Sequence, residues 1–287
     1  MEPLFGFEWN QTEGAQELEA GLFTVVAKDL KGDFHAVGTG FVVIARDEVA
    51  LAVSAGHVFA EVQRLQDDGI GRVHPSTLPE FAPPKKPVNV SLSGLAMLSR
   101  VGALVFASRV EGLAFDALSD IGVIQLRPQQ GSTFPLALRQ FTLEDRLPEV
   151  GDLVCIAGYA DLSCKPQGLD GFQVQRKAVL RVGKVSNVFP DGQRLCRGPC
   201  FETTIPVFSG MSGSPVCYYE SVGAMKVVGL VCSDPDVDGP AKNDRSAAGK
   251  SLVACLPTRR QSGSPQGVQE VMMSFAPTAV TGSFVGL

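Results

Sequence analysis

Short apolar segments alternate along the chain with turns that are rich in Gly, Pro, Asp and Asn. Val, Ile and Phe are concentrated in the apolar segments, and this composition, together with the frequent turns, is typical of the strands of a sandwich or barrel. We therefore predict an all-β protein. The predicted strands are residues 21–27, 40–45, 49–54, 88–92, 121–126, 152–157, 177–188, 201–207, 225–232 and 251–256.

Helical periodicity is limited to residues 56–65, directly after a predicted strand, and residues 265–273. Residues 66–87 are rich in Pro and Asp and form a connection that is longer than usual. A charged segment at 139–150 separates two strand-rich halves. It predicts two domains, residues 1–145 and residues 146–287, the second with a C-terminal tail from about residue 259.

The composition agrees with a folded protein, because 45% of the 287 residues are hydrophobic and 17 are Phe, enough to bury a sizeable core. The formal net charge is −5 and no basic run stands out, so we expect no nucleic-acid partner. The N-terminal residues lack the basic start and apolar run of a secretory signal. No uncharged segment near an end reaches the roughly 20 apolar residues of a spanning helix. We expect no membrane association and a cytoplasmic location.

The seven cysteines all lie in the second half of the chain. Their odd number and uneven distribution favour buried or reduced thiols over a disulfide scaffold. Cys196 and Cys200 are the only close pair and resemble half of a metal site or a redox bridge, but no His lies beyond residue 74 to complete a mixed zinc site. We expect no metal or other cofactor. A structural protein built on this pair remains an alternative.

Three segments carry residues that are chemically matched to one another. His57 follows an apolar strand, Asp120 stands at the start of another, and Ser212 lies in the glycine-rich turn 210–213. A Ser hydroxyl needs an adjacent base to become a nucleophile, and the imidazole in turn needs a buried carboxylate to hold its tautomer. We predict these three residues as a catalytic triad, with the N–H groups of Gly210 and Ser212 as donors to the oxyanion. Asp116 is the rival for the carboxylate.

The order of the three residues along the chain separates the classes of serine hydrolase. An α/β-hydrolase places its His after the Ser, but no His follows Ser212, and Ser214 stands where the nucleophile elbow has Gly. The order Asp, His, Ser requires an acidic residue before His57 and an α/β fold; the available residues are Asp29, Asp33 and Asp47. The order His, Asp, Ser is the one that agrees with an all-β fold.

These motifs resemble those of the trypsin/chymotrypsin-like serine peptidases, nearer the compact bacterial or HtrA-type branch. The matching segments are Gly-Thr-Gly-Phe at 38–41, Ala-Gly-His-Val at 55–58, Asp-Ile-Gly-Val-Ile at 120–124 and Gly-Met-Ser-Gly-Ser-Pro at 210–215. The resemblance covers roughly residues 20–258. It implies two six-stranded antiparallel barrels with the active site between them, His57 and Asp120 in the first and Ser212 in the second. The backbone edge that it implies for an extended substrate is that of Val231, Cys232 and Ser233.

Some positions depart from the family pattern. Met211 replaces the acidic or amide residue before the nucleophile, so activation by a freed N-terminus is not implied, and Ser214 replaces a Gly. Only about 30 residues follow the last predicted strand, too few for a PDZ domain. These departures leave the three predicted catalytic residues His57, Asp120 and Ser212 in place.

Taken together, the residues and the resemblance predict a serine endopeptidase that acts on a protein or peptide through an acyl-enzyme. An intracellular peptidase must spare its neighbours, so we expect narrow specificity or regulation, for example by a specific protein partner or activator. The connection 66–87 and the tail beyond residue 258 are the candidate gates. The alternative is a non-catalytic module that binds peptides or proteins on the same fold.

Overall fold

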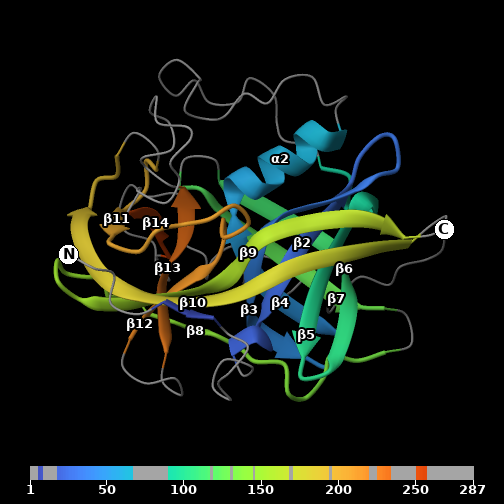
Figure 1. The fold of residues 1–287 in the computed structure, drawn as a ribbon, viewed down its shortest axis with the longest axis horizontal. Helices are drawn as coiled ribbons and strands as arrows, with labels where there is room; N and C mark the ends of the chain where they lie inside the picture. The colour runs from blue at the N-terminus through green and yellow to red at the C-terminus, as the bar shows by residue number, and fades with distance from the viewer. Residues whose placement is uncertain are drawn as a thin grey trace, which may run out of the picture.

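Two closed rings of antiparallel strands organise the protein (Figure 1). The structure is a computed structural model, and it describes residues 6–8, 18–66, 90–116, 119–129, 132–144, 146–167, 171–193, 196–219, 225–233 and 250–256. The first ring has the strand order β2-β3-β4-β7-β6-β5. Its strands are β2 (Leu22–Lys28), β3 (Phe34–Arg46), β4 (Val49–Ala55), β5 (Leu95–Val101), β6 (Leu104–Asp116) and β7 (Ile121–Pro128).

The second ring has the order β10-β11-β14-β13-β12-β9, and pairing of β9 with β10 closes it. Its strands are β9 (Leu153–Gln167), β10 (Gly171–Phe189), β11 (Cys200–Thr203), β12 (Pro215–Tyr218), β13 (Lys226–Ser233) and β14 (Ser251–Cys255). Two short strands from the N-terminal half also join it: β1 (Gly6–Glu8) pairs with β10, and β8 (Thr142–Leu143) pairs with β13. The all-β prediction with two six-stranded barrels is therefore confirmed.

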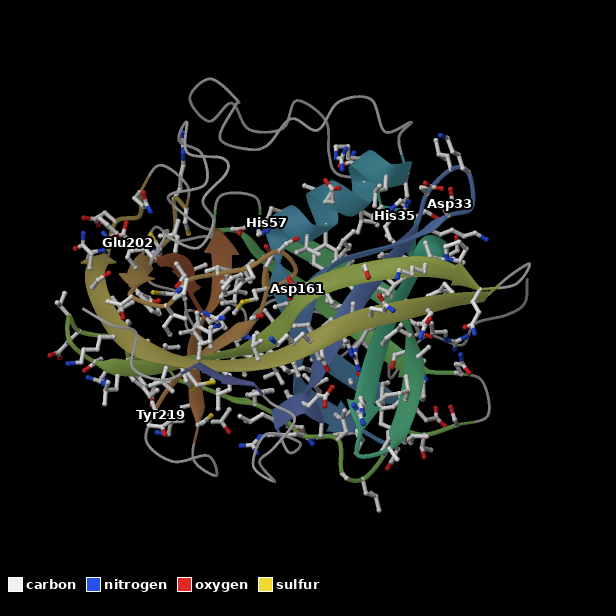
Figure 2. The ribbon with its side chains drawn as sticks, viewed as in Figure 1. Asp33, His35, His57, Asp161, Glu202 and Tyr219 are labelled. Atoms are coloured by element: carbon white, nitrogen blue, oxygen red, sulfur yellow. The ribbon has the colours of Figure 1, made fainter. Side chains whose placement is uncertain are left out.

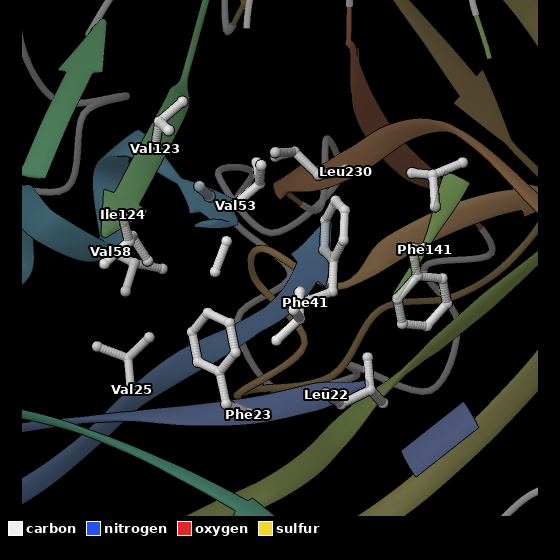
Figure 3. Packing of buried hydrophobic residues seen from close by; sticks show 14 of the residues in the cluster. Leu22, Phe23, Val25, Phe41, Val53, Val58, Val123, Ile124, Phe141 and Leu230 are labelled. Atoms are coloured by element: carbon white, nitrogen blue, oxygen red, sulfur yellow. The ribbon is translucent and has the colours of Figure 1, made fainter. Parts of the chain in front are cut away.

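One hydrophobic core joins the two rings. Phe23 and Phe41 of the first ring are fully buried, and Phe41 meets Phe141 edge to face at 5.6 Å between ring centroids. Leu230 of the second ring belongs to the same cluster (Figure 3). Because apolar side chains of both rings exclude water from one shared interior, the rings are held in a defined relative position.

Most predicted strands are confirmed, and the exceptions have local causes. Five strands were not predicted: β1, β5, β6, β8 and β12. In β5 and β6, Ser, Arg and Glu interrupt the apolar residues. The strand predicted at 88–92 is wrong in its described part, where residues 90 and 91 are irregular and Leu92–Gly94 forms a 3-10 turn. Strand β11 ends at Thr203, so residues 204–207 of the strand predicted at 201–207 are irregular.

The helix predicted at 56–65 is confirmed as α2 (Gly56–Gln66), which buries Val58, Phe59 and Val62. The helix predicted at 265–273, the connection after residue 66 and the tail from residue 259 lie outside the described residues. Within the described chain, no helix combines the length and the apolar character that crossing a membrane requires.

Strands β9 and β10 form a two-stranded ribbon that runs past the second ring and across the first (Figure 1). Near its tip, Phe172 of β10 stacks on Phe34 of β3, with 4.2 Å between the ring centroids. The second ring therefore touches the first through this ribbon as well as through the shared core.

Candidate active site

His57 and Asp120 are brought together by the pairing of two neighbouring strands of the first ring. Strand β4 ends at Ala55, which lies opposite Ile121 at the start of β7. The Gly56 N–H donates to the Asp120 carbonyl at 2.9 Å. Because antiparallel neighbours place the end of one strand beside the start of the other, the first turn of α2 lies against the residue that precedes β7 (Figure 2 labels His57).

The Asp120 carboxylate holds His57 at two points. Its Oδ2 lies 2.8 Å from His57 Nδ1, and its Oδ1 accepts the His57 backbone N–H at 2.7 Å. Asp120 is buried and has a positive φ of 57°, a conformation in which Asp is less strained than most residues. The pair of contacts orients the imidazole and leaves Nε2 as the nitrogen that faces away from the carboxylate.

Ser212 lies in a tight turn between β11 and β12. Gly210 and Gly213 on either side have φ of 97° and 83°, in the left-handed region that glycine adopts without strain. The Ser214 N–H donates to the Met211 carbonyl at 2.9 Å, and the Gly213 N–H donates to the Val231 carbonyl at 2.8 Å. These bonds close the turn on itself and fasten it to β13.

Thr39 of β3 fastens the same turn to the first ring. Its backbone N–H donates to the Ser212 carbonyl at 2.8 Å, and its Oγ1 donates to the Gly210 carbonyl at 2.7 Å. Thr39 belongs to the Gly-Thr-Gly-Phe segment at 38–41, for which the sequence predicted no hydrogen-bonding role. The contact places the Ser212 turn of the second ring beside the residues of the first ring that carry His57.

The amides of Gly210 and Ser212 are available to a ligand. Neither N–H donates a hydrogen bond within the part of the chain that the structure describes. In a trans peptide the C=O and the N–H point in opposite directions. The Met211 carbonyl is bonded to the Ser214 amide, so the Ser212 N–H points to the other side of that peptide, away from the turn's interior.

The Ser212 turn packs against the end of β4, the strand that precedes His57. Gly213, next to Ser212, packs against Ala55: a Cβ added to Gly213 would lie 2.8 Å from the Ala55 nitrogen. Among the described residues, no hydrogen bond joins Ser212 Oγ to His57 Nε2. Such bonds are often long in unliganded enzymes and shorten when a substrate binds.

These three side chains and two amides have the chemical types that a nucleophile, a base, an orienting carboxylate and an oxyanion site require. Residues 38–230 match the family model of the trypsin-like peptidase domain. The chain belongs to this family. The match begins within β3 and ends within β13, so it includes strands of both rings and all four motifs quoted above.

The fold of this peptidase domain is similar to that of solved serine proteases. The thermostable serine protease AL20 from an extremophilic microorganism has 11% identity and a TM-score of 0.52, over 93% of this chain and 100% of that chain. The active form of the Rv3671c protease from M. tuberculosis has 13% identity and a TM-score of 0.46, over 96% and 86%. Deg5 has 17% identity and a TM-score of 0.46, over 77% and 82%. No curated protein sequence matches this chain.

Val231 of β13 differs from the other two predicted substrate-binding residues, because its backbone groups are already bonded within the peptidase domain. The Val231 N–H donates to the Ser214 carbonyl at 3.0 Å, and its carbonyl accepts from Gly213, so both of its groups bind the Ser212 turn. The implied role of Val231, Cys232 and Ser233 in binding substrate stays a prediction. Of the three, Val231 already uses both backbone groups within the chain.

The Cys232 side chain has a role that sequence reasoning missed. Its thiol donates to the Leu230 carbonyl at 3.9 Å and lies near enough to Asp120 for the two groups to interact electrostatically. Burial, together with the negative charge of Asp120, raises the pKa of the Cys232 thiol to about 12, so the thiol stays protonated and uncharged. The Asp120 carboxylate, which His57 contacts at two points, therefore has a neutral thiol from β13 of the other ring near it.

Cys196 and Cys200 use their thiols within the chain. All seven cysteines are free, and the Cys196 thiol donates to the carbonyl of Ser119, the residue before Asp120, at 3.5 Å. The Cys200 thiol donates to the Cys196 carbonyl at 3.6 Å. No group of three or more His, Cys, Asp or Glu residues in the described chain is arranged to hold a metal ion. The pair supports the segment that carries Asp120.

Proposed function

We propose that this member of the trypsin-like family is an active serine endopeptidase with the triad Ser212, His57 and Asp120. The observation that carries the proposal is the two-point hold of Asp120 on His57, combined with the unused amides of Gly210 and Ser212 in a turn fastened beside it. Each of these features supports one step of the proposed peptide hydrolysis.

The proposed reaction begins with Ser212 Oγ attacking the scissile carbonyl carbon while His57 Nε2 takes its proton. The carboxylate of Asp120 accepts the Nδ1–H, which keeps the Nε2 lone pair available and stabilises the imidazolium that forms. The negative charge on the carbonyl oxygen is stabilised by the Gly210 and Ser212 N–H groups. His57 then donates its proton to the leaving amine, and water hydrolyses the acyl-enzyme by the reverse sequence.

The proposed substrate is a protein or peptide segment bound in an extended conformation beside β13. An extended chain satisfies its backbone polar groups on a strand edge, and side-chain pockets then set the specificity. The segments predicted as gates, 66–87 and the tail beyond residue 258, remain proposals for regulation.

The proposal is tested by intact mass spectrometry after reaction with a fluorophosphonate probe. We expect one covalent adduct on the wild-type protein and none on Ser212→Ala or His57→Ala, with Ser93→Ala as a control because Ser93 is exposed and lies outside the site. If well-folded wild-type protein takes no adduct, the endopeptidase proposal is contradicted and a module that binds peptides without cleaving them is favoured.

The pH dependence of labelling follows from the environment of His57. Burial alone would lower the pKa of the imidazole, but the adjacent Asp120 carboxylate outweighs it, so the pKa lies above the ordinary 6.5. Only the neutral imidazole accepts the Ser212 proton, and a raised pKa extends the protonated form to higher pH. We therefore expect the labelling rate to fall with decreasing pH through a midpoint above 6.5.

The measurement is the second-order labelling rate between about pH 5 and 9, the range in which imidazoles titrate. His35→Gln is the control, because His35 of β3 pairs with Asp29 of the turn after β2 and lies outside the proposed triad. That variant is expected to keep the wild-type midpoint. A wild-type midpoint below 6.5 contradicts the raised pKa.

A further inference from the structure

The orientation of one peptide unit decides whether Gly210 can serve the oxyanion. The Ser209 carbonyl accepts a hydrogen bond from the Asp161 N–H at 3.0 Å. No cis peptide occurs in the described chain, so the N–H of the Ser209–Gly210 peptide points opposite to this carbonyl. A half-turn of the peptide would exchange the two groups and present a carbonyl oxygen where the N–H now is. The Asp161 amide therefore selects the orientation that a developing negative charge requires.

Asp161 reaches the turn because it lies in a β-bulge of the ribbon. Ala160 pairs with Lys177 and Ser163 pairs with Gln175, so two residues of β9 lie opposite the single residue Arg176. Asp161 has a φ of 54°, and its N–H leaves the ladder to bind Ser209. Such bulges redirect groups near functional sites.

The second residue of the bulge also contacts the turn. A Cβ added to Gly210 would lie 2.5 Å from Leu162 Cγ, so the Leu162 side chain rests directly on the Gly210 backbone. The bulge thus meets the Ser212 turn through one hydrogen bond and one close packing contact. Figure 2 labels Asp161 on the ribbon.

Arg176, opposite the bulge, fastens the ribbon to the first ring. Its Nη1 donates to Thr24 Oγ1 and to the Leu98 carbonyl, each at 2.9 Å. Thr24 and Leu98 are directly paired on β2 and β5, so the guanidinium joins β10 to two strands of the other ring. The carboxylate of Glu19 lies 3.9 Å from the guanidinium, and the side chains of both residues are largely buried. A buried guanidinium with several partners holds its position firmly.

A second set of contacts connects Arg176 with the carbonyl group of Gly210. The guanidinium lies 4.2 Å above the Tyr159 ring, and the Tyr159 N–H donates to Thr39 Oγ1 at 3.3 Å. Thr39 Oγ1 in turn donates to the Gly210 carbonyl. The Ser209–Gly210 peptide is therefore held by Asp161, which lies in the bulge opposite Arg176. The Gly210–Met211 peptide is held by Thr39, which is bonded to the residue on which Arg176 stacks.

We propose that Asp161 and Arg176 are positioning residues for the oxyanion site, and that the β9–β10 ribbon holds the Ser209–Gly210 peptide with its N–H directed at the substrate carbonyl. This inference rests on the proposed function. It implies that the ribbon determines whether the oxyanion site can bind a negative charge. Neither residue touches the substrate; both act through the backbone of the turn.

The test compares a backbone variant at position 161, in which the α-hydroxy acid analogue of Asp replaces the N–H by an ester oxygen, with Asp161→Asn, which keeps the amide. Both changes tolerate the positive φ of this residue, which proline would not. The readout is the plateau rate of fluorophosphonate labelling at alkaline pH and the pH midpoint. Loss of one oxyanion donor typically costs about 100-fold. We expect that loss of plateau rate for the ester variant with the wild-type midpoint, and a loss below about threefold for Asp161→Asn.

Arg176→Met provides the second variant, because it leaves every backbone group of the ribbon in place. We expect its plateau rate to fall at least about 10-fold, since small displacements of reacting groups are costly. Arg109→Met, on an exposed position of β6, is the matched control. Hydrogen exchange of the Asp161 amide is followed in parallel, and we expect its protection in the wild type to be lost in Arg176→Met.

The outcomes separate this inference from the proposed function. If the wild type is labelled and both the ester variant at position 161 and Arg176→Met retain the plateau rate within threefold, the positioning role is overturned. It is also overturned if the wild-type Asp161 amide exchanges as fast as an exposed one. If the wild type takes no label but Arg176→Met still removes the protection of Asp161, the proposed function fails and the hold on the peptide is confirmed.

Discussion

Replacing Asp120 with asparagine is expected to lower the rate of Ser212 labelling at neutral pH by about 10⁴-fold. The carboxylate has an acceptor for each of two donors, the His57 backbone N–H and the Nδ1–H. An asparagine has one carbonyl oxygen and one NH₂. The backbone N–H is always a donor and takes the oxygen, so the NH₂ faces Nδ1 and forces the proton onto Nε2. The imidazole then cannot accept a proton from Ser212.

The measurement is the second-order rate of fluorophosphonate labelling, combined with proton NMR of the hydrogens bound to the His57 ring nitrogens. The Nδ1 proton resonance of the wild type is expected to disappear in Asp120→Asn. Asp191→Asn removes one carboxylate on the exposed surface and is expected to label at the wild-type rate. A rate for Asp120→Asn within tenfold of the wild type would exclude Asp120 as the orienting carboxylate.

Replacing Gly213 with alanine is expected to lower both stability and labelling. A Cβ at this position would collide with the Thr39 carbonyl, Ser54 Oγ and the Ala55 nitrogen, all in the first ring. The positive φ costs about 1–2 kcal/mol and overpacking about 1–3 kcal/mol, so we expect the free energy of unfolding to fall by about 2–5 kcal/mol. Relieving the collision moves the Ser212 turn away from His57, and labelling is expected to fall at least about 100-fold.

Gly151→Ala is a matched control for this change. Gly151 also has a positive φ, of 98°, but no atom lies within 4 Å of the position of its added Cβ. The Gly151→Ala variant therefore has only the conformational cost, and we expect its free energy of unfolding in urea to fall by about 1–2 kcal/mol. Its labelling rate is expected to equal that of the wild type. Equal losses of labelling in the two variants would show that backbone strain, and not the contact between the rings, explains the effect.

The residues that could be predicted from the sequence are those with a local signal. His57 follows an apolar strand and begins a helix, and Asp120 precedes an apolar strand, as the structure shows. The turn around Ser212 was predicted from its glycines, and both have a positive φ. Apolar strands and glycine turns depend on neighbouring residues, which the sequence displays directly.

Other residues of the site have no local signal. Thr39 lies 171 residues from Gly210 along the chain, and Arg176 lies 152 residues from Thr24. Asp161 is one residue of a long strand, and its position in a bulge is visible only when β9 is aligned with β10. Cys232 was predicted for its backbone, whereas its thiol lies near Asp120. Each of these roles arises from a contact between segments that are far apart in the sequence.

The sequence by itself determined the fold class and the chemical groups of the candidate site, because strand patterns, turn residues and residue types are local properties of the chain. The tertiary structure decided which peptide units are turned toward the site and what holds them there. A peptide orientation is set by the hydrogen-bond partner of its carbonyl, and for Ser209 that partner comes from a ribbon that is also fastened to the other ring.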